Sequence, residues 1–146
     1  MRASDVSEES LAPRPRVVRT CGALDGAELT HPFGVDTAVF KVGGKIFAIL
    51  SLHEDPPRVT LKCDPDYAIL LAQQFDEIAP GYHMNKRHWI TATLSSTLSA
   101  DLVDDLIGVS YDLVVAALAA DVRSALRASG ERPRHVSDAS HPSRPD

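Results

Sequence analysis

Two apolar runs joined by a pair of glycines form the clearest pattern in the chain. They span Thr37–Val42 and Lys45–Leu52, with Gly43-Gly44 between them. A two-residue β-hairpin turn of this kind needs positive φ at both positions, which glycine adopts without strain. The pattern therefore predicts a β-hairpin. Its expected cross-strand pairs are Val42 with Lys45, Lys41 with Ile46, and Phe40 with Phe47.

Shorter runs predict further strands. Ala27–His31 is a weak strand that Pro32 ends, and Ile78–Gly81 leads into a turn at its last two residues. A polar loop at His53–Pro57 precedes the next strand. The two remaining strands alternate apolar and polar residues with a period of two, and they are Arg58–Lys62 and His88–Leu94.

Helical signals lie on either side of these strands. A short helix is expected at Pro15–Leu24, because proline suits the first helical turn. Asp64 can cap a second helix that begins at Pro65. The residues expected to form the buried stripe of the second helix are Ala68, Leu71, Ala72 and Phe75.

The C-terminal part of the domain predicts two helices. Ser99 can cap a short helix at Ala100–Ile107, and Gly108 is expected to separate it from a longer one at Val109–Arg127. The element order contains hairpins and no alternation of strand and helix. It therefore predicts an α+β fold, with an antiparallel β-sheet covered on one face by helices.

Composition indicates one domain with polar ends. A chain of 146 residues suits a single core. Residues 1–16 and 128–146 hold too few apolar residues to fold, so we expect disordered tails around a domain at 17–127. No run approaches the ~20 apolar residues of a membrane span, and the N-terminus lacks a secretory signal. The expected location is the cytoplasm, with no membrane partner.

Cationic and aromatic residues concentrate in the strand region. Eight positions near the last strand hold Tyr82, His83, Asn85, Lys86, Arg87, His88 and Trp89. Lys41, Lys45 and Lys62 lie on neighbouring strands of the predicted sheet. Such a surface can bind a nucleic-acid strand or an anionic ligand. The alternative is a solvated rim of charges, with Trp89 anchored in the core.

The charge balance limits this surface. The formal net charge is -5, and all of it falls on residues 17–127, because each tail is neutral. A protein that binds nucleic acid mainly through phosphates needs a positive surface. Any such surface must therefore be a local patch.

Catalytic and metal-binding motifs are missing from the sequence. There is no C-x-x-C or H-E-x-x-H pattern, and Ser110 lacks the G-x-S-x-G context of a hydrolase nucleophile. Cys63 follows an apolar strand position, so it is expected to be a buried, unreactive thiol. The sequence predicts neither an enzyme nor a cofactor or metal site.

Four motifs in fixed order resemble those of the MmcQ/YjbR family. They are G-K-x-F-A at Gly44–Ala48, L-K-C-D-P at Leu61–Pro65, N-K-R-H-W at Asn85–Trp89 and S-Y-x-L-V at Ser110–Val114. The resemblance covers most of the predicted domain. It implies a compact α+β domain, similar to CyaY-like and secretion-chaperone folds, in a small bacterial cytosolic protein that is not an enzyme.

The resemblance also implies DNA binding, which is proposed for the family from a "double wing" arrangement. The residues expected to contact nucleic acid or another anion are Lys41, Lys45, Lys62, Tyr82, Asn85, Lys86, Arg87, His88 and Trp89. Two other functions stay open. One is a protein-interaction module, chaperone-like or homodimeric. The other is a protein that binds a small ligand or anion, or an enzyme of unknown activity, with a pocket formed by Lys62, Asn85, Lys86, Arg87 and His88. Convergence of Lys45, Lys62, Arg87 and Trp89 on one face would favour binding over the solvated rim.

Overall fold

The computed structural model describes residues 12–81 and 87–128, with side chains as far as Val122. Residues up to Val115 form one compact unit that contains the whole sheet. A second unit begins at Ala116, and its described part is the C-terminal portion of a helix. The expected tails therefore lie almost entirely outside the described residues.

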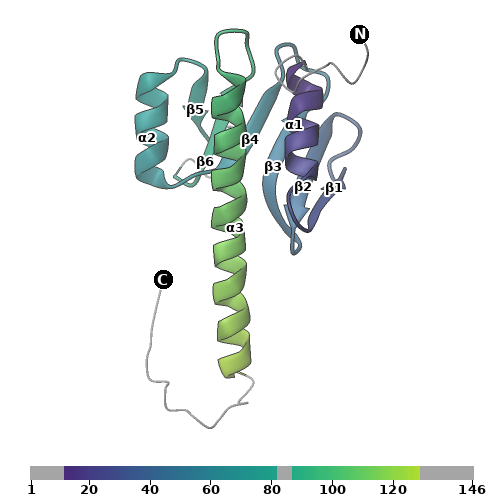
Figure 1. The fold of residues 1–146 in the computed structure, drawn as a ribbon, viewed down its shortest axis with the longest axis vertical. Helices are drawn as coiled ribbons and strands as arrows, with labels where there is room; N and C mark the ends of the chain where they lie inside the picture. Colours follow the sequence, from purple (N-terminus) through teal and green to yellow (C-terminus); the bar gives the residue numbers. More distant parts are fainter. Residues whose placement is uncertain (1–11, 82–86, 129–146) are drawn as a thin grey trace. The chain divides into compact units, whose positions relative to one another are not determined.

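Within the described residues, six antiparallel strands form a single sheet (Figure 1). Their order across the sheet is β1-β2-β3-β4-β6-β5, so β6 lies between β4 and β5. The strands are β1 (Ala27–Thr30), β2 (Thr37–Val42), β3 (Lys45–Ser51), β4 (Arg58–Lys62), β5 (Ile78–Pro80) and β6 (Trp89–Thr93). The predicted α+β class and antiparallel sheet are confirmed.

The same described ranges contain three helices: α1 (Pro13–Gly22), α2 (Pro65–Gln74) and α3 (Ala100–Ala128). Helices α1, α2 and the part of α3 up to Val115 lie on one side of the sheet (Figure 1). The Asp64 carboxylate accepts a hydrogen bond from the backbone N–H of Asp66 at 3.2 Å, as expected for the N-cap of α2. In the α2 stripe, Ala68 and Leu71 are buried, whereas Ala72 and Phe75 are half-buried.

Helix α1 begins earlier than predicted. Its first residue is Pro13 rather than Pro15, so Pro13–Arg16 belong to the folded unit and not to a tail. Arg16 is 5 % exposed. Its partners lie more than eighty residues away in the sequence, which is why local polarity suggested disorder there.

The predicted hairpin between β2 and β3 is confirmed with one correction of register. Val42 pairs with Lys45 and Lys41 with Ile46, but Phe40 pairs with Ala48 instead of Phe47. The register shift leaves Phe47 as the extra residue of a β-bulge. Its ring packs edge-on against Tyr111 of α3, with centroids 5.4 Å apart. The bulge therefore directs Phe47 to the helix side.

The predicted helix break at Gly108 is wrong, because α3 continues through this position. Glycine within a helix costs roughly 0.5–1 kcal/mol relative to alanine. The neighbouring Leu106 and Ile107 are fully buried, and burial of side chains of this size contributes about 1.5–3 kcal/mol each. Packing thus outweighs the local preference for a break.

Candidate functional site

The side of the sheet opposite the helices carries a row of paired residues. We call it the helix-free face, because no helix of the described residues up to Val115 lies on it. Register places Val39, Ile49, Thr60 and Thr91 side by side across β2, β3, β4 and β6. All four are at most 4 % exposed. This row divides the helix-free face into two ends.

The cations expected from the sequence lie at one end of the sheet. Lys41 is the last residue but one of β2, Lys45 begins β3 and Lys62 ends β4, and antiparallel pairing brings these positions to one end of the sheet. Arg87 and His88 immediately precede β6, and the backbone N–H of Cys63 donates to the carbonyl of His88 at 2.8 Å. We call Lys41, Lys62 and Arg87 the basic end. Tyr82, Asn85 and Lys86 lie outside the described residues.

Strand alternation separates Lys45 from the basic end. Lys41 lies two residues after Val39, and Lys62 lies two residues after Thr60. Because every second residue of a strand lies on the same face, both lysines lie on the helix-free face. Two strand spacings separate their backbones by about 10 Å. Lys45 pairs with Val42, which lies on the helix side of β2, so Lys45 lies on the helix side as well. The cations are therefore gathered at one end of the sheet but divided between its faces.

Trp89 and Glu28 modify the expected surface. Trp89 pairs with Lys62 and is 9 % exposed, so most of its ring is not available for stacking on a base. Exposed Glu28 of β1 pairs with Lys41, and a carboxylate here weakens the local positive potential. Arg87 and His88 are both exposed.

A cavity of about 310 Å³ occupies the other end of the helix-free face, and we call it the polar pocket. Its lining residues are Asp36, Thr37, Ile49, Ser51, His53, Glu54, Arg58 and Thr60. Five of them lie on strands at positions that alternate onto the helix-free face. The sequence does not reveal this pocket, because His53–Pro57 predicts only a polar loop. The polar residues of the alternating Arg58–Lys62 run were the one available signal.

Hydrogen bonds fix the walls of the polar pocket. The backbone N–H of Leu52 donates to the Asp36 carbonyl at 2.9 Å, and that of Arg58 donates to Ser51 Oγ at 2.8 Å. From α1, the Arg14 guanidinium donates to the carbonyls of Ser51, at 3.0 Å, and of Glu54. The loop that carries His53 and Glu54 is therefore held from several sides.

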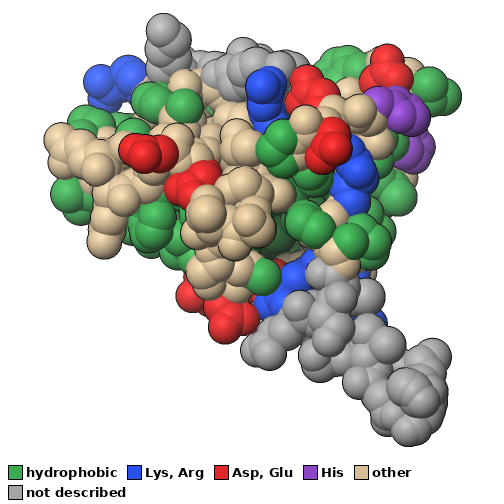
Figure 2. Space-filling model, turned by 90° about the horizontal axis from the view of Figure 1, so that it is seen from above, with side chains coloured by type: hydrophobic (Ala, Val, Ile, Leu, Met, Phe, Trp, Pro, Cys, Tyr) green, Lys and Arg blue, Asp and Glu red, His purple; other side chains and the backbone are tan. Residues whose placement is uncertain are grey.

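Two exposed ion pairs lie at the rim of the polar pocket. His53 Nε2 is 3.5 Å from Asp36 Oδ1, and an Arg58 guanidinium nitrogen is 3.7 Å from Glu54 Oε2. In the view of Figure 2, basic, acidic and histidine side chains are interspersed, and no continuous basic surface is visible. Positive charge on this part of the molecule is thus compensated locally.

The polar pocket continues inward as a chain of hydroxyl groups. Thr91 Oγ1 donates to the carbonyl of Gly81 at 2.8 Å. Its single proton is therefore used, and the 3.0 Å contact between Thr60 Oγ1 and Thr91 Oγ1 has Thr60 as the donor. Thr60 consequently offers acceptor lone pairs to the pocket.

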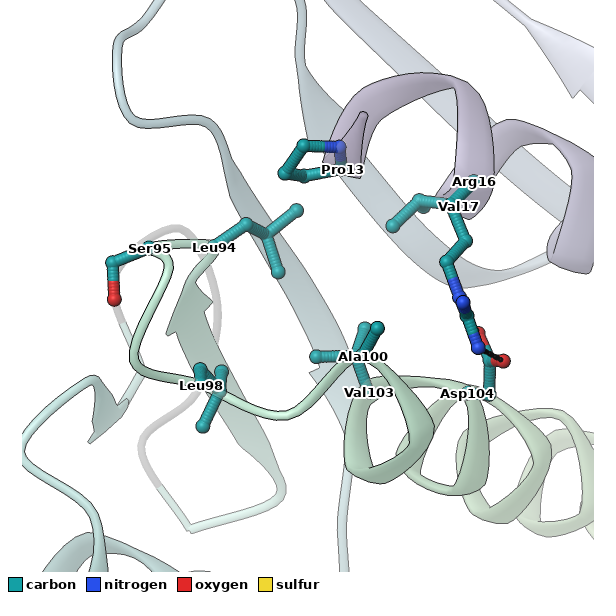
Figure 3. Close-up of a pocket in the computed structure, with 9 residues that line it drawn as sticks. All are labelled: Pro13, Arg16, Val17, Leu94, Ser95, Leu98, Ala100, Val103 and Asp104. Carbon is teal, nitrogen blue, oxygen red and sulfur yellow. Dashed lines mark hydrogen bonds and ion pairs between the residues drawn. The ribbon is translucent and has the colours of Figure 1, made fainter. Parts of the chain in front are cut away.

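A smaller cavity of about 60 Å³ lies between α1, the 94–98 segment and the start of α3 (Figure 3). Arg16 donates to Asp104 Oδ2 at 2.6 Å and to Asp101 Oδ1 at 3.1 Å, while Thr20 donates to Asp104 Oδ1 at 3.0 Å. Hydrogen bonding to Asp104 raises the pKa of Arg16, against the opposing effect of burial. These four residues, the Arg16 cluster, fasten α1 to α3, and we assign them a structural role.

The last family-like motif also has a structural role. Ser110 Oγ donates to the carbonyl of Phe47 at 2.6 Å and accepts from the N–H of Lys62 at 2.8 Å. It therefore bridges β3 and β4 beside the bulge. Tyr111 donates its hydroxyl proton to the carbonyl of Asp25 at 2.5 Å. Both side chains hold α3 against the sheet.

The two cysteines are buried thiols, as Cys63 was expected to be. Burial raises the pKa of Cys21 to about 12 and that of Cys63 to about 11, with the nearby Asp104 and Asp64 carboxylates adding to the effect. Both thiols are protonated at neutral pH and are poor nucleophiles. Within the described residues, no group of three or more His, Cys, Asp or Glu side chains could hold a metal ion. Nor does any described helix combine the length and apolar character of a membrane span.

Similar proteins share both sequence and fold with this chain. It is 47% identical over 96 residues to the uncharacterized protein YbdF of Escherichia coli O157:H7, covering 66% of this chain and 79% of YbdF. It is 33% identical over 110 residues to the uncharacterized protein YjbR of Escherichia coli K12, covering 75% and 93%.

Solved structures agree with these relationships. A crystal structure of a Deinococcus radiodurans protein with a DUF419 domain matches 93% of this chain and 99% of its own, with a TM-score of 0.72 and 33% identity. A Pseudomonas syringae protein matches 68% and 97%, with a TM-score of 0.60 and 29% identity. The YjbR family model matches residues 22–113, which include the whole sheet and α2. The chain belongs to the YjbR family.

Proposed function

We propose that this protein binds nucleic acid without catalysis, in the cytoplasm, and that the basic end of its sheet contacts the phosphates. The observation that carries the proposal is the strand register. It gathers cations from β2, β4 and the segment before β6, although they are far apart in the sequence. Lys41 and Lys62 also share one face, which no helix of the described residues up to Val115 covers.

The surroundings of the basic end define the kind of binding. Three phosphate contacts on duplex DNA correspond to a slope of log K against log salt of about −3. The net charge of -5 opposes approach of a polyanion. Trp89 is largely buried, so base stacking contributes little. The proposed binding is therefore weak, dependent on salt and insensitive to base sequence.

Fluorescence anisotropy with a labelled duplex across a salt series tests this proposal. The double variant Lys41→Ala/Lys62→Ala should reduce the salt slope by about 2, because two phosphate contacts are lost. Lys45→Ala is the matched control, since it removes the same charge at the same end but from the other face. An equal loss in Lys45→Ala would show that only overall charge matters. Absence of binding by the wild type at low salt would refute the proposal.

A second candidate is protein–protein interaction at the edge of the sheet, which the exposed apolar residues near β1 favour. β1 forms one edge of the sheet, and Leu29, Phe33 and Val35 on or after it are 48%, 64% and 79% exposed. Edge strands of this kind can pair with a strand of another chain. A concentration-dependent mass in light scattering, abolished by Leu29→Lys, would support a homodimer through β1. A constant monomeric mass would exclude this homodimer.

A further inference from the structure

We propose that the polar pocket binds a small zwitterion, a molecule that carries a carboxylate and an ammonium group at short distance, such as a free α-amino acid. The site differs from the basic end, because its lining starts at Ile49 and Thr60 of the buried row and extends from there toward the opposite end of the helix-free face. The inference does not depend on nucleic-acid binding.

The size and construction of the polar pocket are those of a ligand site. Its volume of about 310 Å³ lies at the lower end of the ~300–1,000 Å³ typical of small-molecule pockets. The β-strands that form its floor are rigid, and the hydrogen bonds of Arg14, Leu52 and Ser51 hold its loop in place. A preformed site of this kind binds without a large cost of ordering.

The charges of the polar pocket select for a ligand of both signs. Arg58 supplies a guanidinium, which binds a carboxylate through two parallel hydrogen bonds. Asp36 and Glu54 supply carboxylates for an ammonium group. A simple anion would face both acidic side chains, and a simple cation would face Arg58. Only a zwitterion satisfies both signs at once.

The existing ion pairs allow this exchange. The Arg58–Glu54 and His53–Asp36 contacts measure 3.7 and 3.5 Å, and their side chains are between 39% and 79% exposed. Exposed pairs of this type contribute little to stability. A ligand that binds Arg58 and Asp36 must break these two ion pairs. Because the pairs are weak, breaking them reduces the binding free energy only slightly.

Uncharged groups complete the recognition. Ser51 Oγ accepts from the N–H of Arg58, so its own proton remains to be donated to a ligand carboxylate. Thr60 offers lone pairs to an ammonium group, because its proton goes to Thr91. Ile49 provides an apolar surface on the floor, where the side chain of an amino acid can pack. Each part of an amino acid thus finds a matching group.

A titration followed by two-dimensional ¹H–¹⁵N NMR tests the proposal. Each of the common L-amino acids is added to the full chain up to about 10 mM, a range that detects millimolar dissociation constants. The best binder is then compared with the amine that lacks its carboxylate and the acid that lacks its ammonium group. We expect shifts at Thr37, Ile49, Ser51 and His53, and at least tenfold weaker binding of both analogues. Equal binding of either analogue, or no binding by any amino acid, overturns the proposal.

Variants assign the binding to the two charges. Arg58→Gln and Asp36→Asn should each weaken binding of the best amino acid about tenfold. Both side chains lie at the exposed rim, so a folding defect in one leaves the other as an independent test. Lys45→Ala is the control, because Lys45 belongs neither to the polar pocket nor to the basic end, and it should leave the affinity for the amino acid unchanged. Unchanged affinity in both pocket variants overturns the proposal, whereas loss of DNA binding in Lys41→Ala/Lys62→Ala concerns only the basic end.

Discussion

The Arg16 cluster and the polar pocket contain the same kinds of charged group but differ in burial. In the Arg16 cluster, Arg16 is 5 % exposed and the bond from its guanidinium to Asp104 measures 2.6 Å. In the polar pocket the Arg58–Glu54 contact is longer, at 3.7 Å, and solvated. A buried charge is costly to leave unpaired, whereas an exposed charge can change partners. The first region therefore holds the fold together, and the second is available to a ligand.

Replacement of Arg16 by alanine should produce the largest loss of stability. Removal of one partner from a fully buried ion pair costs about 3–5 kcal/mol, and we expect a loss of about 3 kcal/mol here, because Asp104 is 25% exposed and keeps its hydrogen bond from Thr20. Urea denaturation measures this loss directly. Arg14→Ala on the same helix is the control, and it should cost about 1 kcal/mol, because Arg14 only donates to exposed or half-buried carbonyls. Equal losses in the two variants would contradict the structural role of the Arg16 cluster.

Ser110→Ala should have the next largest effect. The change leaves the N–H of Lys62 and the carbonyl of Phe47 without their shared partner, at a cost of about 2 kcal/mol. Ser99→Ala, which removes only the hydrogen bond to the N–H of Leu102 at the start of α3, should cost about 1 kcal/mol. Thermal unfolding of both variants gives the comparison. A loss in Ser110→Ala no greater than in Ser99→Ala would mean that the bridge between β3 and β4 contributes nothing.

Gly108→Ala should stabilise the protein by about 0.5–1 kcal/mol, because alanine loses less backbone entropy in a helix. A Cβ atom at this position would meet no heavy atom within 4 Å other than those of its chain neighbours and the nearby helix backbone. Urea denaturation would detect the gain as a higher midpoint with an unchanged slope. A lower midpoint would show that α3 bends or breaks at this residue.

Arg58→Gln should have the smallest effect on folding. Loss of an exposed ion pair changes stability by less than about 1 kcal/mol. Urea denaturation of Arg58→Gln and of Arg16→Ala gives the losses in free energy of unfolding for the two regions, which can then be compared directly. A loss as large as that of Arg16→Ala would make the polar pocket a structural element and remove the basis of its exchangeable ion pairs.

Local signals in the sequence were sufficient for most of the fold. Gly43-Gly44 fixed the hairpin and Asp64-Pro65 fixed the start of α2, because the turn and the cap depend on adjacent residues. Features that depend on distant partners were not predicted. The bulge at Phe47 forms where Tyr111 and Ser110 of α3 meet the sheet, and no alternation pattern within β3 reveals them.

The candidate sites show the same difference between features set by adjacent residues and features set by distant partners. Lys41 and Lys62 were identified because basic residues in strands stand out in the sequence, but only the register showed that Lys45 alternates onto the other face. The polar pocket was missed, since Asp36 and His53 come together only when β2 and β3 pair. The sequence shows which residues are charged, but only the fold shows which of them lie together on one face or in one pocket.

An NMR titration with a short DNA duplex at low salt tests the central proposal most directly. Electrostatic attraction is least screened under these conditions. The account predicts saturable changes in the backbone signals of Lys41, Lys62 and Arg87, with the signals of Ser51, His53 and Arg58 unchanged. Changes confined to the polar pocket, or none at any duplex concentration, would contradict binding at the basic end.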